Sequence, residues 1–362
     1  MQGSQTEGVT TNGLERSDTV ALSVLDLCPV SDGSNPAEAL ANSLDLAPRI
    51  ERLGYRRHWV AEHHNMPGIA SSAPAVLLAH IAQVTSTIRI GSGGVMLPNH
   101  APLAIAEQFG MLEALHPGRV DLGLGRAPGT DGITAAALRR GQRPTAEDDF
   151  PDQLAQLLGF FGRGFPENHP FRAITAVPAL GYQPMMWMLG SSDYGAQVAG
   201  MLGWPYSFAH HFAAEGTDHA LAAYRDSFRP SELLDRPYSM IGVSVVCADT
   251  DDRAMYLAGS GLLAFVRLRS GRPGLYPTPQ EAADYDYSPG EQRIIEHRLM
   301  SSVIGSPRTV RRQLQELVDR TGVDELMITT MMHSHTDRVR SYELLTEELT
   351  AHPLERAVAL PV

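Results

Sequence analysis

The sequence predicts an α/β fold, a closed (β/α)8 TIM barrel with an insertion between its seventh and eighth strands. Two observations lead to this prediction. Eight short apolar runs alternate with helical patterns along the chain, which is the rhythm of parallel βαβ units. Several runs also end in His, Gly or Arg, and barrel folds place their functional residues at the carboxyl ends of the strands. Eight alternations favour a closed barrel over an open sheet.

The expected strands are short and rich in apolar and β-branched residues, as strands buried on both faces are. They lie at residues 20–30, 57–65, 88–98, 118–129, 184–190, 204–212, 238–248 and 324–333. The first strand carries Cys28 and the seventh carries Cys247. We expect both to be small core residues rather than a disulfide or a metal-binding pair.

The expected helices follow the strands in order. The first begins at Pro36 and ends near Gly54, the usual positions of these two residue types. The helices lie at residues 36–54, 73–84, 103–115, 146–161, 191–203, 214–228, 249–268, 307–322 and 338–349. The segment 269–292 is rich in Pro, Gly, Tyr and charge and exceeds a minimal barrel. We expect it to be either a lid over the site or a passive surface loop.

Composition and charge are those of an ordinary globular enzyme, with 43% hydrophobic and 19% charged residues. We expect one domain over residues 20–352, with a disordered N-terminal tail (1–19) and a C-terminal tail (353–362). The net charge of −12 argues against nucleic acid or an anionic membrane as the main partner. The sequence has neither an apolar run of ~18 residues nor a signal peptide at its start, so we expect a cytoplasmic protein with no membrane contact.

The absence of lysine narrows the chemistry. All 29 Lys and Arg positions are arginine. Schiff-base catalysis and a P-loop both need a lysine, so neither is available to this chain.

Histidines gather at the ends of three expected strands, as His63-His64, His210-His211 and His333-Ser334-His335. Metal hydrolases on this barrel draw histidines from several strands, with carboxylates beside them, and the strand at 20–30 has no histidine. We therefore expect no metal site.

Glu62, His63 and His64 close the second expected strand. Adjacent residues in a strand point to opposite faces, so one histidine should face the barrel mouth and the other should pack outward. The position at a strand's carboxyl end favours a functional role for the histidine that faces inward.

Two further groups point to a ligand with a flat part and an anionic part. Three glycines within 91–94 interrupt an otherwise strong strand, which indicates close approach of a flat ligand to bare backbone. Arg126 ends the fourth strand, and Gly190, Ser191 and Ser192 end the fifth at the start of a helix. A guanidinium beside a helix N-terminus is typical of a phosphate pocket, although the serines alone would indicate only a helix cap.

At these residues the sequence resembles the bacterial-luciferase-like flavin-dependent monooxygenases, from about residue 20 to residue 350. It looks most similar to the actinobacterial subgroup found in natural-product pathways. The resemblance rests on WVAEHHN (59–65), GSGGVMLP (91–98), LEALHPGRVDLGLGRAPG (112–129), LGSSDYGAQVA (189–199), GSPRTVRRQL (305–314) and DELMITTMM (324–332). Together these motifs are a strong signal, whereas any one of them alone is weak.

The resemblance assigns roles to particular residues. His63 matches the catalytic histidine that faces the C4a edge of the flavin, and Gly93-Gly94 matches a non-proline cis peptide against which the flavin ring packs. The cofactor phosphate is matched to Arg126, Ser191, Ser192 and the amide of Tyr194, and we expect Gly190 beside them to contact the cofactor as well. Two departures from luciferase, Ser191 in place of a Glu and Gly125 in place of a reactive Cys, mean that light emission and an aldehyde substrate are not implied.

The implied activity is oxygenation of a small organic substrate by FMNH2 and O2 through a C4a-peroxyflavin. FMN is the implied cofactor, a separate flavin reductase supplies it in reduced form, and the protein is expected to be a homodimer. The natural-product resemblance places the reaction in secondary metabolism. Two alternatives stay open: a deazaflavin-dependent oxidoreductase of the same superfamily, and a non-catalytic flavin-binding protein.

Overall fold

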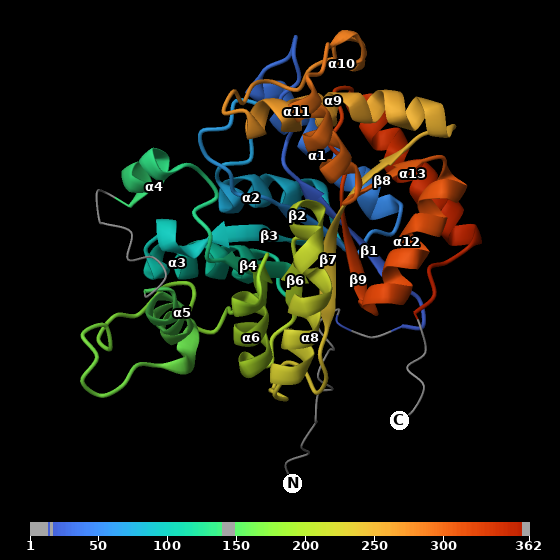
Figure 1. The fold of residues 1–362 in the computed structure, drawn as a ribbon. Helices are drawn as coiled ribbons and strands as arrows, with labels where there is room; N and C mark the ends of the chain where they lie inside the picture. The colour runs from blue at the N-terminus through green and yellow to red at the C-terminus, as the bar shows by residue number, and fades with distance from the viewer. Residues whose placement is uncertain (1–13, 15–16, 140–148, 357–362) are drawn as a thin grey trace.

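Eight parallel strands close into a barrel, which confirms the predicted fold class (Figure 1). Consecutive strands pair from β1 to β7, and β9 completes the circle by pairing with both β7 and β1. The strands are β1 (Ala21–Asp26), β2 (Arg57–Val60), β3 (Arg89–Met96), β4 (Val120–Gly125), β5 (Met185–Gly190), β6 (Tyr206–Phe208), β7 (Ser239–Cys247) and β9 (Glu325–Thr329). Each lies within one of the eight apolar runs.

The structure is a computed structural model and describes residue 14 and residues 17–139 and 149–356. The predicted tails, 1–19 and 353–362, lie largely outside these residues. Where the chain ends are described they pair with each other, because the Val20 amide donates to the Leu354 carbonyl at 3.0 Å. None of the described helices has the length and apolar character of a bilayer span.

Helices cover the outside of the barrel. Those that match the predicted segments are α1 (Pro36–Arg52), α2 (Pro74–Val84), α3 (Pro102–Leu115), α5 (Phe150–Leu158), α6 (Asp193–Leu202), α8 (Thr217–Ser227), α9 (Asp251–Arg269), α12 (Pro307–Thr321) and α13 (His335–Ala351). Four α-helices among the described residues were not predicted: α4 (Gly132–Leu138), the four-residue α7 (His210–Ala213), α10 (Pro279–Asp284) and α11 (Pro289–Leu299). The prediction of a strand over 204–212 was therefore wrong at its end, because residues after Phe208 turn into α7.

A ninth strand, β8 (Ser302–Gly305), lies between β7 and β9 in the sequence and was also not predicted. It pairs with Ser244–Cys247 of β7, whereas β6 pairs only with Ser239–Ile241 of the same strand. β8 has only four residues and is followed almost at once by the helix that starts at Pro307. Its sequence is therefore too short to show the alternation typical of a strand. The wall of the barrel beside β7 is thus shared by two short strands.

The segment 269–292 holds the short helix α10 (Pro279–Asp284) and the start of α11 (Pro289–Leu299). Both helices pack against α9, and Figure 1 shows them together at one end of the barrel. Ser288 begins α11 with a capping box completed by Glu291. The backbone of Tyr276 bonds to Val30 and Asp32 at 2.9 and 2.8 Å, which ties the insertion to the loop after β1.

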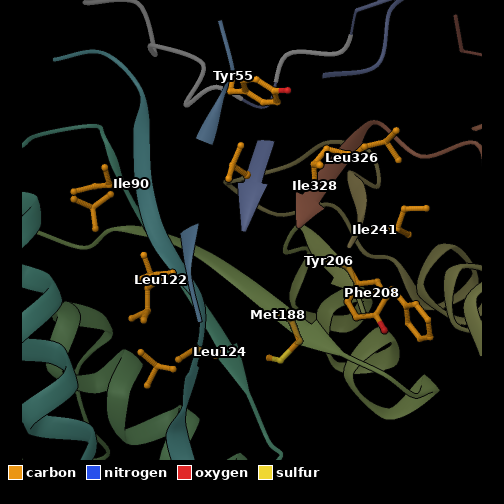
Figure 2. Close-up of a cluster of buried hydrophobic side chains, with 14 of the residues drawn as sticks. Tyr55, Ile90, Leu122, Leu124, Met188, Tyr206, Phe208, Ile241, Leu326 and Ile328 are labelled. Atoms are coloured by element: carbon orange, nitrogen blue, oxygen red, sulfur yellow. The ribbon is translucent and has the colours of Figure 1, made fainter. Parts of the chain in front are cut away.

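The main hydrophobic core lies between the strands and the helices around them. Its side chains come from the outward faces of the strands (Figure 2), among them Ile90, Leu122, Ile241 and Ile328. A second cluster fills the barrel interior and includes Trp59 and Trp187, whose rings meet edge to face at 5.1 Å between centroids.

Four charged side chains close the amino-terminal end of the barrel. We call them the ionic cluster: Arg57, Arg89, Asp121 and Glu325. The fully buried Arg57 guanidinium reaches Asp121 at 2.8 Å and Glu325 at 2.9 Å. Arg89 binds the other oxygen of Asp121 at 2.6 Å. Burial alone would raise the pKa of Asp121, but the two guanidinium groups lower it below its usual value. The amino-terminal end of the barrel is therefore closed by buried charges that are paired with charges of the opposite sign.

Candidate active site

A cavity of about 820 Å³ opens at the carboxyl ends of the strands, where barrel folds build their sites. Its floor is apolar, formed by inward-facing side chains such as Leu25, Trp59 and Met327. Seven of the eight site residues predicted from the sequence line this one cavity: His63, Gly93, Arg126, Gly190, Ser191, Ser192 and Tyr194. Gly94 is the eighth and does not line it.

His63 stands in the loop that follows β2 and faces the cavity. Its amide donates to the Ser71 carbonyl at 3.0 Å, and its Nδ1 lies 3.4 Å from the Gly129 carbonyl. Burial lowers the pKa of His63 below its usual value, although the Gly129 carbonyl opposes this shift. The imidazole is therefore neutral near pH 7, so it can either donate or accept a proton there.

The neighbours of His63 make contacts that hold this loop in place, and of the two only Glu62 also lines the cavity. Glu62 is buried, and its carboxylate accepts from the Met96 amide at 3.0 Å and contacts the Nε2 atoms of His64 and His100 at 3.0 and 2.9 Å. Burial by itself raises the pKa of Glu62, but His100 and then His64 lower it below the usual value. The structure thus places His63 inward and His64 outward, the alternation expected of the pair.

The glycines of β3 have different neighbours. The Gly93–Gly94 peptide bond is cis, and Gly93 lines the cavity. A Cβ at Gly94 would lie 2.7 Å from the Gly123 carbonyl of β4, and one at Gly91 would lie 2.6 Å from the Trp59 indole nitrogen. Gly91 and Gly94 are therefore required by packing within the barrel. A Cβ at Gly93 would also come within 2.6 Å of Leu25 Cδ1. Gly93 alone of the three lines the cavity, so ligand approach stays a prediction for Gly93.

One corner of the cavity has the features of an anion site. Ser192 is the N-cap of α6 in extended conformation, and its hydroxyl makes no capping hydrogen bond. The Arg126 guanidinium, from the loop after β4, stacks over the Tyr194 ring at 4.2 Å. Among the described residues Arg126 forms no ion pair. A guanidinium without an ion-pair partner among the described residues, beside a helix N-terminus, suits a phosphate.

Asp193, the first residue of α6, contacts a histidine that lies outside the cavity. Its carboxylate is exposed and lies 3.1 Å from Nε2 of His219 on α8. A hydrogen bond from its own backbone amide, followed by the contact with His219, lowers the pKa of Asp193. An acidic residue in the first turn is also the usual partner of the helix dipole.

A second histidine lines the cavity, and it was not among the predicted site residues. His211 belongs to α7, and its ring lies against β7 at Gly242, where a Cβ would come within 2.6 Å of Nδ1. Burial lowers the pKa of His211 to about 3, with the nearby Arg298 contributing. His210 points elsewhere, with Nδ1 2.7 Å from the Thr217 hydroxyl. The sequence placed both histidines at the end of an expected strand, but only the contact with Gly242 in the structure distinguishes His211 from His210.

The remaining histidine motif lies apart from the cavity. His333 Nε2 contacts the Asp32 carbonyl at 3.0 Å, and His335 Nε2 contacts the Asp45 carboxylate at 2.8 Å. Within the described ranges no three His, Cys, Asp or Glu side chains are grouped to hold a metal ion.

The insertion lines a second, smaller cavity of about 110 Å³ and does not contribute to the walls of the large one. Pro273, Gly274 and Tyr276 form one side of this small cavity, and Arg298 of α11 lies in its wall. The chain therefore carries two cavities at the same end of the barrel.

The comparisons with known proteins place the chain among relatives of the same length. Residues 21–325 match the family model of luciferase-like monooxygenases. A luciferase-like monooxygenase of Escherichia coli is 46% identical, over 90% of this chain and 96% of its own. The 4-hydroxyprotoasukamycin monooxygenase of Streptomyces nodosus subsp. asukaensis is 38% identical, over 86% of each chain. The crystal structure of apo-MsnO8 has a TM-score of 0.80 at 37% identity, covering 92% of this chain and 99% of its own.

Proposed function

We propose, from the premise that the chain belongs to the luciferase-like monooxygenase family, that it uses reduced FMN and O2 to oxygenate a small organic substrate. Membership itself implies a flavin monooxygenase. The observation that carries the choice of FMN is the corner formed by Arg126, Ser192 and Tyr194 at one end of an 820 Å³ cavity. A charged phosphate at that corner would place the rest of the cofactor along Gly93 and toward His63.

The described residues fit this cofactor. The phosphate would be held by the Arg126 guanidinium, the Ser191 and Ser192 hydroxyls and the first amides of α6, and Gly190 leaves room for it beside the strand. When bound, the reduced flavin supplies the electrons that activate O2. The chain contributes an apolar floor that excludes water and a neutral imidazole at His63 that can hold or move one proton.

The partners follow from the same proposal. The sequence has no recognisable dinucleotide fingerprint, which supports a separate flavin reductase as the source of FMNH2. We include a role in secondary metabolism on the resemblance described for the sequence. The relatives include proteins of Streptomyces and of Escherichia coli and do not single out an actinobacterial group. We include the homodimer in the proposal on the resemblance alone.

The test is oxygen transfer itself. Protein supplied with FMNH2 and ¹⁸O2 is expected to place one labelled oxygen atom in a product when screened against metabolites of its genomic neighbourhood. Turnover with a reduced deazaflavin in the absence of O2 would support the deazaflavin alternative. Tight FMN binding without any product across the screen would support a non-catalytic flavin-binding protein.

Removing the guanidinium at the proposed phosphate corner should weaken FMN binding. Arg126→Ala deletes a charge-assisted contact of roughly 1.5–3 kcal/mol, so the Kd for FMN should rise about tenfold or more. Fluorescence titration of FMN measures this, with Arg163→Ala as the control, because Arg163 is exposed and lies outside the cavity. An unchanged Kd in Arg126→Ala would show that the phosphate binds elsewhere.

The insertion 269–292 is proposed as a lid that closes when substrate is present. If it does, its backbone amides should exchange with deuterium more slowly with substrate bound than without it. Peptides from α12, which lines neither cavity, serve as the internal reference. Equal exchange of 269–292 in both states would leave the segment a surface loop.

A further inference from the structure

The small cavity beneath the insertion has a composition of its own. It is lined mainly by apolar side chains from β7, β8, α9 and the loops around them, including Val246, Phe265 and Met331. Four side chains bring polar groups into its wall: Arg298 of α11, Tyr276 of the insertion, Ser244 of β7 and Ser302 of β8. None of the lining residues is acidic. All the polar side chains can therefore donate a hydrogen bond, and one of them is a cation.

The small cavity lies directly beside the large one. Ser244 lines the small cavity and Gly242 lines the large one, and residues two apart in a strand face the same side. His211 gives a second link, because its ring lines the large cavity while its carbonyl accepts from the Arg298 guanidinium. A molecule seated in the small cavity would therefore point toward the space assigned to the flavin.

Arg298 is half-buried and has few polar partners. Within the part of the chain that the structure describes, its guanidinium meets the His211 carbonyl and the Phe265 ring, with 5.0 Å from Cζ to the ring centroid. It makes no salt bridge with a described carboxylate. Burial lowers the pKa of Arg298, which is the sign of a cation that has lost water without gaining a counter-charge.

Tyr276 completes the polar side of this cavity. Its ring closes the space between the insertion and Gly68, and burial raises the pKa of its phenol to about 12, with Arg298 opposing the shift. The phenol is therefore protonated at neutral pH and can donate a hydrogen bond. A cation and hydroxyl donors, set in an apolar wall, match an oxyanion attached to a short apolar chain.

We propose that this cavity is the substrate subsite and that Arg298 binds a carboxylate group of the substrate, which orients the apolar part toward the flavin. This inference rests on the proposed function and adds the class of substrate to it. The volume limits the group to a small one, because an engineered apolar cavity of about 150 Å³ just holds benzene. The rest of a larger substrate would extend into the large cavity.

The competing explanation is structural: Arg298 sits in the last turn of α11, where a cation stabilises the helix dipole. A structural arginine would not discriminate between a carboxylate and a neutral molecule of the same shape. Butanoate and butanamide differ in this one respect and are suitable probes.

The experiment uses protein with ¹³C-labelled methionine methyl groups, recorded with and without FMN. Met66 and Met331 line the small cavity, whereas Met96 and Met327 line the large one, so the shifted signals identify the cavity that is occupied. Butanoate should shift Met66 and Met331 at a concentration at least about tenfold below that needed for butanamide. Arg298→Gln should remove this preference, and Arg293→Gln, an exposed arginine of the same helix, should keep it.

Four results would overturn the proposal: equal response to both probes, shifts confined to Met96 and Met327, a preference that persists in Arg298→Gln, or no shift at about 50 mM butanoate. If Arg298→Gln does not fold, the wild-type comparison still decides, and Arg298→Lys should retain part of the preference. The readout needs neither oxygen transfer nor FMN. A failure of the proposed flavin chemistry would therefore leave these signals unchanged and be recognised separately.

Discussion

His63→Ala is expected to lower the rate of substrate oxygenation by ~10²–10⁴-fold, the usual loss when a general acid–base group is removed. The Kd for FMN should stay within a few-fold, because the phosphate and the ring are bound by other residues. His63 faces the cavity with a neutral imidazole, and its amide donates to the Ser71 carbonyl. Without it, reduced flavin should still consume O2 but release H2O2.

The measurement is the yield of oxygenated product and of H2O2 per FMNH2 consumed, after rapid mixing with O2. His80→Ala is the matched control, because this histidine is exposed on α2 and lies outside the cavity. It should behave like the wild type. Wild-type yields of both products in His63→Ala would make His63 a structural histidine.

Arg57→Met should lower the free energy of unfolding by about 3–5 kcal/mol, the cost of removing one partner from a buried ion pair. The substitution leaves Glu325 and one oxygen of Asp121 without the guanidinium that now contacts them. Urea unfolding followed by circular dichroism measures the loss. Arg312→Met is the control: its pair with Glu316 is at the surface, with both side chains more than 60% exposed, and should contribute about 0–1 kcal/mol.

The ionic cluster at the amino-terminal end of the barrel also determines how the free energy of unfolding changes as the pH falls. The pKa of Asp121 is lowered in the folded state, so its stabilising contribution is present above the unfolded value and is lost as the pH falls through the folded value. In Arg57→Met the Asp121 pKa should rise, and the difference in stability between variant and wild type should shrink below about pH 4. A difference that stays constant with pH would contradict the assignment.

The sequence was informative where a pattern is local. The eight strands were visible because each is an apolar run bounded by turn residues, and Arg126 and Ser192 because they follow such runs directly. What was missed depends on contacts between distant segments. Nothing near Gly94 indicates that the Gly123 carbonyl occupies the place of its side chain. The sequence alone does not distinguish His211 from His210. The structure does, because the His211 ring lies against Gly242 of another strand.

The sharing of the edge of β7 between β6 and β8 has a consequence for how such an enzyme could change. The walls that would hold the cofactor come from β2 to β5, whereas the small cavity is built from the upper half of β7, β8 and the helices α9 and α11. The two cavities lie next to each other at Gly242 and His211. Substitutions in β8 and α11 can therefore reshape the small cavity for a new substrate while leaving the residues around the flavin unchanged. A mutational library confined to residues 289–305 is where altered substrate specificity should be sought first.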